Sequence, residues 1–136
     1  MNHLDISKYS YFSELPLEQF NNYKISVYVI DKNWNYLFVN DFVKKNLGKR
    51  AENLIGKNMW QEFKELVIDP SFVLLKKNTE KGLNTNLITT SPINSQRLNI
   101  IGYPLKDCYF FSSSILPKKE DLIDELRHQL KNTATT

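Results

Sequence analysis

Ile25-Ser-Val-Tyr-Val-Ile-Asp31 and Asn35-Tyr-Leu-Phe-Val-Asn40 are two runs of β-branched and aromatic residues, separated only by Lys32-Asn-Trp34. Such runs are typical of β-strands, and the polar residues between them are typical of a turn. Two strands joined by so short a link pair as an antiparallel hairpin. The sequence therefore predicts two paired strands over residues 25–31 and 35–40.

The residues that follow this hairpin favour helices. Asp41 suits the N-cap of a first helix, which Gly48 would end. Asp69 followed by Pro70 is typical of the start of a longer helix, because proline is tolerated in a first turn. Together with an amphipathic segment before the hairpin, we expect helices over residues 13–22, 41–48, 51–55, 58–65 and 69–82.

Three further strands are expected over residues 84–90, 97–105 and 107–116, and their short polar links indicate an antiparallel meander. From Pro117 onward the composition changes to leucine and charged residues, with acidic residues first and basic residues last, as in a helix aligned with its dipole. A five-stranded antiparallel sheet interrupted by helices must carry those helices on one face. The predicted class is α+β, with flanking helices at both ends.

Bulk properties limit the classes of function. The chain has 136 residues, 41% hydrophobic and 24% charged, with a net charge of +3 that is spread along it. No dense basic run favours nucleic-acid binding, and no apolar run approaches the ~20 residues of a membrane span. The single cysteine, Cys108, suits a reducing compartment. We expect a soluble cytoplasmic domain without a nucleic-acid partner.

This order of elements and its residues resemble the PAS domain. The hairpin ending in Asn40, the stretch Leu47-Gly48 … Leu54-Ile-Gly-Lys57, and the strand Tyr109-Phe-Phe-Ser-Ser-Ser-Ile115 are similar to successive PAS signatures. The resemblance covers about residues 13–116. It implies a PAS domain there, an N-terminal extension over 1–12 and a signalling helix over 117–136.

A PAS fold implies a pocket between the sheet and its helical insert, which holds a ligand or is filled by side chains. The resemblance places Tyr28 and Ile30 on the inward face of their strand, and Phe110, Ser112 and Ser114 on that of the last strand. A shift of one residue would reverse these faces, so Ser112 and Ser114 are either ligand contacts or structural hydroxyls. The pocket candidates are Tyr28, Ile30, Met59, Phe72, Leu75, Asn86, Asn99, Phe110, Ser112 and Ser114.

The cofactor remains unidentified from the sequence. Flavin photosensors of this family carry a reactive cysteine in the insert, and the comparable stretch 56–60 has none. Haem-binding members place a histidine on the longer helix, and residues 69–82 contain none. Met59 is expected to fill space in the hydrophobic core, and Cys108 to be a small core residue or a surface thiol. With only His3 and His128 available, we expect no metal site.

The last segment has apolar residues at the spacing of a helix that pairs with a second helix. Leu116, Ile123, Leu126 and Leu130 are separated by seven, three and four residues, which matches two heptads of a coiled coil. One interpretation is a helix that pairs two protomers into a homodimer and passes a signal to a downstream output domain. The other is an amphipathic helix that folds back on its own sheet.

His128 followed by Lys131-Asn132 is similar to the phosphoacceptor motif of some sensor histidine kinases. The leading hypothesis is a sensory and dimerisation module of a bacterial signalling protein that binds a small ligand. The alternatives are a ligand-free interaction module, and a truncated sensor kinase that includes the start of its phosphoacceptor helix. A small-molecule enzyme of the ketosteroid-isomerase type ranks last, because Asp31, Asp41, Asp69 and Asp107 occupy turn or cap positions. No catalytic residue is predicted.

Overall fold

The computed structural model describes residues 5–117 and 119–134. Its centre is one five-stranded antiparallel sheet with the strand order β2-β1-β5-β4-β3, which confirms the predicted α+β class. The first and last strands along the chain, β1 and β5, therefore lie side by side in the middle. The strands are β1 (Ser26–Asp31), β2 (Tyr36–Val39), β3 (Thr85–Thr90), β4 (Arg97–Pro104) and β5 (Cys108–Ile115).

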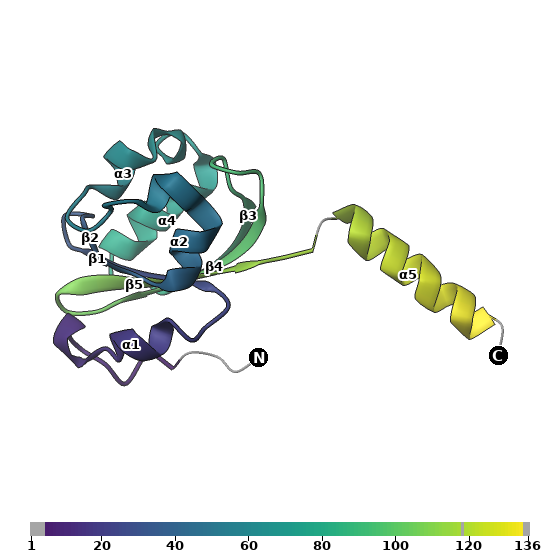
Figure 1. Ribbon diagram of the computed structural model, residues 1–136, viewed down its shortest axis with the longest axis horizontal. Helices are drawn as coiled ribbons and strands as arrows, with labels where there is room; N and C mark the ends of the chain where they lie inside the picture. Colours follow the sequence, from purple (N-terminus) through teal and green to yellow (C-terminus); the bar gives the residue numbers. More distant parts are fainter. Residues whose placement is uncertain (1–4, 118, 135–136) are drawn as a thin grey trace.

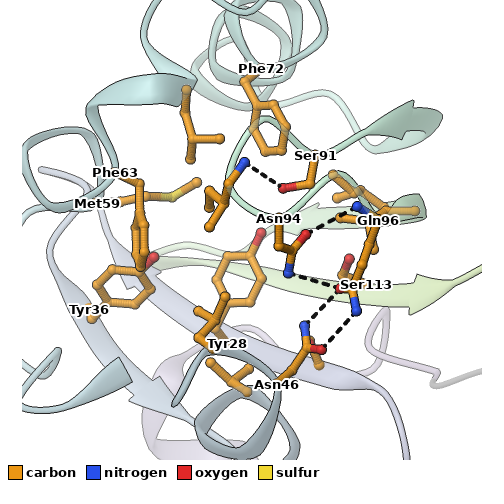
Figure 2. A pocket seen from close by; sticks show the side chains of 17 residues that line it. Tyr28, Tyr36, Asn46, Met59, Phe63, Phe72, Ser91, Asn94, Gln96 and Ser113 are labelled. Atoms are coloured by element: carbon orange, nitrogen blue, oxygen red, sulfur yellow. Dashed lines mark hydrogen bonds between the residues drawn. The ribbon is translucent and has the colours of Figure 1, made fainter. Parts of the chain in front are cut away.

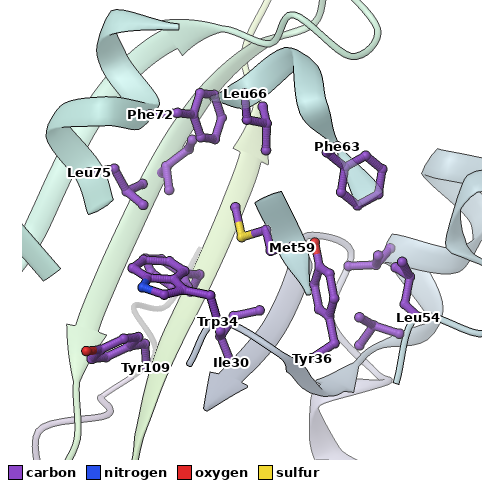
Figure 3. Close-up of a cluster of buried hydrophobic side chains, with 14 of the residues drawn as sticks. Ile30, Trp34, Tyr36, Leu54, Met59, Phe63, Leu66, Phe72, Leu75 and Tyr109 are labelled. Carbon is purple, nitrogen blue, oxygen red and sulfur yellow. The ribbon is translucent and has the colours of Figure 1, made fainter. Parts of the chain in front are cut away.

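The segment between β2 and β3 covers one face of the sheet, as Figure 1 shows for α2, α3 and α4. These helices and the sheet enclose the larger apolar cluster, which includes Trp34, Phe63, Leu75 and Tyr109 (Figure 3). The insert consists of α2 (Asp41–Leu47), η2 (Gly48–Ala51), α3 (Met59–Glu62), η3 (Lys64–Leu66) and α4 (Pro70–Glu80).

The N-terminal segment covers the opposite face with η1 (Phe12–Glu14) and α1 (Leu17–Phe20) (Figure 1). A second apolar cluster lies there and includes Phe20, Val27 and Phe110. Ile6 is buried in the same cluster, so the described part of segment 1–12 packs onto the sheet. The sheet is thus buried on both faces over β1 and β5.

Asn40 organises the junction between the two layers. Its side-chain oxygen accepts hydrogen bonds from Val27 N at 3.0 Å and Val43 N at 3.1 Å, and its amide nitrogen donates to Phe20 O and Ile25 O, each at 2.9 Å. Asn40 is therefore the N-cap of α2, whereas the sequence had indicated Asp41. The prediction was one residue late because Asn40 was assigned to the strand, although an N-cap residue has extended backbone angles.

Three other helix predictions need correction. The helix expected over 58–65 is divided at Phe63 into α3 and η3. Residues 51–55 form no helix: η2 ends at Ala51, and Ile55 makes an isolated bridge to Tyr36. The predicted helix over 13–22 is divided into η1 and α1, because Pro16 at the N-cap of α1 interrupts it. The helix start at Asp69 is confirmed, and its carboxylate accepts from Ser71 N and Phe72 N.

The last helix, α5 (Lys119–Ala134), extends away from the sheet in Figure 1. Ile123, Leu126 and Leu130 are 47%, 58% and 69% exposed, so these three side chains do not pack on the body of their own chain. The alternative of a helix folded back on its own sheet is therefore wrong for this structure. No helix among the described residues has both the length and the apolar character needed to cross a membrane.

Candidate functional site

A cavity lies between the inner face of the sheet and the helical insert (Figure 2). Its floor is apolar and its rim is polar. The apolar wall contains Met59 from α3, Phe63, Leu66, Phe72 from α4 and Ile100 from β4. The volume is about 70 Å³, small beside the ~300–1,000 Å³ of ordinary small-molecule sites.

Aromatic side chains of the chain itself pack together beside this cavity. Tyr28 stacks on Phe111 with ring centroids 5.3 Å apart, and Trp34 lies 5.9 Å from the same ring. Gly102 permits this arrangement, because a Cβ there would come within 2.8 Å of the Phe111 ring. The cavity is thus what remains after an aromatic cluster has filled the inner face.

Trp34 enters this cluster through an unusual backbone. It has a φ of 68°, in the left-handed region that a bulky residue rarely adopts. Asp31 stabilises the turn, since its carboxylate accepts from Asn33 N and Asn35 N, each at 2.9 Å. The Trp34 indole nitrogen donates to Glu80 Oε2 at 3.1 Å, which ties the turn to α4. The sequence had assigned Trp34 only to a turn, whereas the structure buries its ring.

Three carboxamides join the rim of the cavity across two elements (Figure 2). Asn46 on α2 and Gln96 before β4 exchange two hydrogen bonds, of 3.0 and 3.1 Å. Asn94 also donates to Gln96 Oε1 at 3.0 Å. The loop itself is held by Ser91 N donating to Gln96 O at 2.7 Å. We call Asn46, Asn94 and Gln96 the amide latch.

Two phenols, Tyr28 and Tyr36, line the cavity, and the hydroxyl of Tyr28 points into its interior (Figure 2). Neither hydroxyl makes a hydrogen bond with any described residue. Burial raises the pKa of Tyr28, and burial, followed by the neighbouring Tyr28 and Glu62, raises the pKa of Tyr36 well above its ordinary value. Both phenols are therefore neutral donors at physiological pH.

Solved structures share this architecture. The photoactive yellow protein domain from the sensor histidine kinase Ppr of Rhodospirillum centenum aligns with a TM-score of 0.60 and 17% identity, over 75% of this chain and 94% of that chain. The PAS domain of BvgS from Bordetella pertussis aligns with a TM-score of 0.54 and 16% identity, over 85% and 94%. The PAS domain of nitrogen regulation protein NR(II) from Vibrio parahaemolyticus aligns with a TM-score of 0.53 and 11% identity, over 76% of this chain and 99% of that chain.

This chain has the PAS fold. At these identities the likeness concerns the fold alone. No protein-family model and no curated protein matches the sequence.

Within the PAS fold, the structure brings part of the predicted pocket together. Tyr28, Met59 and Phe72 line the cavity. Ile30 and Leu75 lie in the same apolar cluster without reaching the cavity. Their contact with a ligand stays a prediction.

The prediction for the last strand was wrong by one residue. Tyr28 pairs with Phe111 and Val27 with Ser112, so the odd-numbered residues of β5 share the inner face. Phe110 lies in the cluster on the outer face, and Ser112 and Ser114 share that face. The serine that lines the cavity is Ser113. Two consecutive aromatic residues, Phe110 and Phe111, left either register compatible with the sequence.

Asn86 and Asn99 also lie on the outer face, which corrects their assignment to the pocket. Asn99 pairs with Ser114 across β4 and β5 and therefore shares its orientation. The Asn99 amide donates to Asn86 Oδ1 at 2.8 Å, so the two side chains satisfy each other on the surface of the sheet. The latch amides could not be recognised from the sequence, because Asn94 and Gln96 lie just outside the predicted strands and Asn46 lies on a helix.

Cys108 and His128 lie away from the cavity. Cys108 is fully buried in the cluster on the outer face, and burial raises the pKa of its thiol to about 12. His128 is exposed on α5, and His3 lies outside the described residues. The described residues contain no group of three metal-ligating side chains. The phosphoacceptor role of His128 stays a prediction.

The carboxylates considered for an enzyme serve local structure. Asp69 caps α4, Asp31 holds the β1–β2 turn, and Asp107 accepts a hydrogen bond from Phe12 N at 2.9 Å. Asp41 is exposed in the first turn of α2. The cavity wall therefore receives none of these four side chains.

Proposed function

We propose that this PAS domain is a sensory module of a bacterial signalling protein, in which occupancy of the cavity changes the state of α5. The observation that carries this proposal is the position of Ser113. Ser113 lines the cavity on β5, and β5 ends at Ile115, just before α5 begins at Lys119. One continuous strand thus connects the cavity wall to the exposed helix.

The proposal includes a homodimer formed through α5. Ile123, Leu126 and Leu130 lie on one face of the helix and are exposed in the single chain. Exposed leucines at heptad spacing are stabilised when a second helix covers them. An output domain, in the same or another chain, would receive the signal from the paired helices in the cytoplasm.

A signal of this kind is limited by the ligand's differential affinity for two states of the domain. Ser113 pairs with Ser26 on one side and Ile100 on the other, so a shift at the cavity wall would move the centre of the sheet. Leu116 N still donates to Arg97 O at 2.8 Å after β5 has ended. The strand is therefore held up to the residue that precedes Pro117.

A ligand-free interaction module remains the second candidate. Its support is the size of the cavity, about 70 Å³, and the aromatic cluster that fills the rest of the inner face. In this case Tyr28, Trp34 and Phe111 would be core residues only. Native mass spectrometry of the purified chain, compared with its denatured mass, distinguishes the two candidates. Extra mass lost on denaturation supports the sensor, and a bare dimer supports the interaction module.

The pairing helix is tested by sedimentation equilibrium. Leu126→Asp places a charge on the exposed apolar face and should weaken self-association by at least about tenfold. His128→Asp is the matched control, because it also introduces an acidic residue at an exposed position of α5 but is not three or four residues from Ile123, Leu126 or Leu130. Equal association of the wild type and Leu126→Asp would remove α5 from the proposal.

A further inference from the structure

The cavity is lined without a single formal charge. The described residues along its wall are apolar side chains, serines, carboxamides and two tyrosines. Lys44 and Lys45 on the neighbouring helix α2 are exposed to solvent and do not line the cavity. The ionisable groups on the wall itself are thus the phenols of Tyr28 and Tyr36.

These phenols do not introduce a charge. Burial raises the pKa of each, so each keeps its proton at physiological pH. A phenol in this state donates one hydrogen bond and accepts others. Since neither hydroxyl has a partner among the described residues, both can donate to an acceptor on a bound molecule.

The rim of the cavity is neutral for a different reason. The latch amides are occupied with one another: Gln96 Oε1 accepts from Asn46 and from Asn94, and Gln96 Nε2 donates to Asn46. Carboxamides offer dipoles but no counter-ion. A carboxylate or an ammonium ion entering here would lose its water and find no opposite charge on the cavity wall, which is strongly unfavourable.

Resting on the proposed function, we infer that this cavity selects a small uncharged molecule with an apolar body and a carbonyl-type acceptor, and that it rejects carboxylates and ammonium ions. The apolar body would face Met59, Phe72 and Ile100, and the acceptor would meet the hydroxyls of Tyr28 and Tyr36. Ser113 completes the wall on the strand that leads to α5.

Three probes of nearly equal shape test the selection by charge: propionamide, propionate and propionamidinium. Each is titrated into the ¹⁵N-labelled full chain at neutral pH, and backbone amide shifts are followed. Propionamide should shift the amides of Tyr28, Ser113 and residues 91–96 in a saturable way. Its Kd should be at least about tenfold below those of both charged probes.

Each other outcome has a defined meaning. If propionate or propionamidinium binds at these amides as tightly as propionamide, the inference about charge is overturned, while the cavity remains a ligand site. If none of the three shifts these amides, the inference and the proposed sensing of small molecules both fail. The wild-type chain alone decides among these results.

A variant tests the assigned donor. Tyr28→Phe removes one hydroxyl with little change in volume and should weaken propionamide binding several-fold. Its fold is checked in the same spectra. Unchanged propionamide affinity in both Tyr28→Phe and Tyr36→Phe would overturn the assignment of the phenols as the donors.

Discussion

Tyr28 on β1 and Phe111 on β5 are register partners whose rings stack with centroids 5.3 Å apart and 24° between their planes. This pair determines which residues of β5 face the insert, because side chains alternate along a strand. It therefore places Ser113 at the cavity and Phe110 in the outer cluster. The same stack explains why Gly102 lies opposite Phe111 on β4.

Gly102→Ala should destabilise the fold by about 1–3 kcal/mol, because the added methyl group would meet the Phe111 ring at 2.8 Å. Urea unfolding followed by circular dichroism gives the free energy. Phe111→Leu removes the ring, so Gly102→Ala should destabilise the fold less when Phe111→Leu is also present. Additive effects of the two changes in a double-mutant cycle would contradict the proposed contact.

Asn40→Ala should destabilise the fold by about 3 kcal/mol, since it leaves Val27 N and Val43 N without their acceptor and Phe20 O without its donor. Asn22 is exposed and makes none of these contacts, so Asn22→Ala is the control and should change stability by less than about 0.5 kcal/mol. Thermal and urea unfolding check both values. If Asn40→Ala lowers the free energy of unfolding as little as Asn22→Ala does, the role given to Asn40 is refuted.

Alkaline pH should destabilise the fold through Tyr36. Its pKa in the folded state lies above the unfolded value of 10.0, so the unfolded chain loses the proton first. The stabilising contribution is complete below pH 10 and is lost as the pH rises toward the folded pKa. Between its unfolded and folded pKa, each such group lowers the free energy of unfolding by up to about 1.4 kcal/mol per pH unit.

Tyr36→Phe should reduce this slope above pH 10, as measured by urea unfolding at successive pH values. Cys108→Ala offers a comparison, because burial raises the pKa of that thiol from 9.0 to about 12 and its contribution falls from about pH 9 upward. Cys108→Ala should therefore change the profile from about pH 9 upward, whereas Tyr36→Phe should change it only above pH 10. An identical profile for the wild type and Tyr36→Phe would argue against a buried neutral phenol.

Asn46→Ala should loosen the amide latch, because it removes both hydrogen bonds between α2 and Gln96. Amide hydrogen exchange of residues 91–96 should become several-fold faster, while exchange in β1 and β5 stays unchanged. Lys45→Ala is the matched control, since Lys45 is the exposed neighbour on α2. Equal protection of 91–96 in all three proteins would show that the latch does not hold this loop.

Much of the fold could be predicted from local patterns. The hairpin around Asp31, the Asp69-Pro70 helix start and the C-terminal meander each rest on residues close in sequence, and the structure confirms them. The face of β5 could not be predicted in this way. It depends on the pairing of Tyr28 with Phe111, which are 83 positions apart, and a shift of one residue preserves every local pattern.

The candidate site was less predictable for the same reason. Tyr28 was placed inward by the resemblance to the PAS domain, and Met59 and Phe72 lie on the insert that this resemblance puts over the sheet. Asn46 and Gln96 belong to no sequence pattern that indicates a contact between them. Their hydrogen bonds form only because the fold brings α2 next to the loop before β4. Asn40 was misread because a residue that ends a strand and caps a helix fits both descriptions.

In the proposed function, occupancy of the cavity changes the pairing of α5. The most direct measurement places a spin label at Arg127→Cys in a Cys108→Ala background and determines the distance between labels in the dimer, with and without propionamide. We predict that the distance distribution shifts at propionamide concentrations that saturate the amide shifts of Ser113. An unchanged distribution at saturation, or the absence of any measurable distance between labels on two copies, would show that the cavity does not control the pairing of α5.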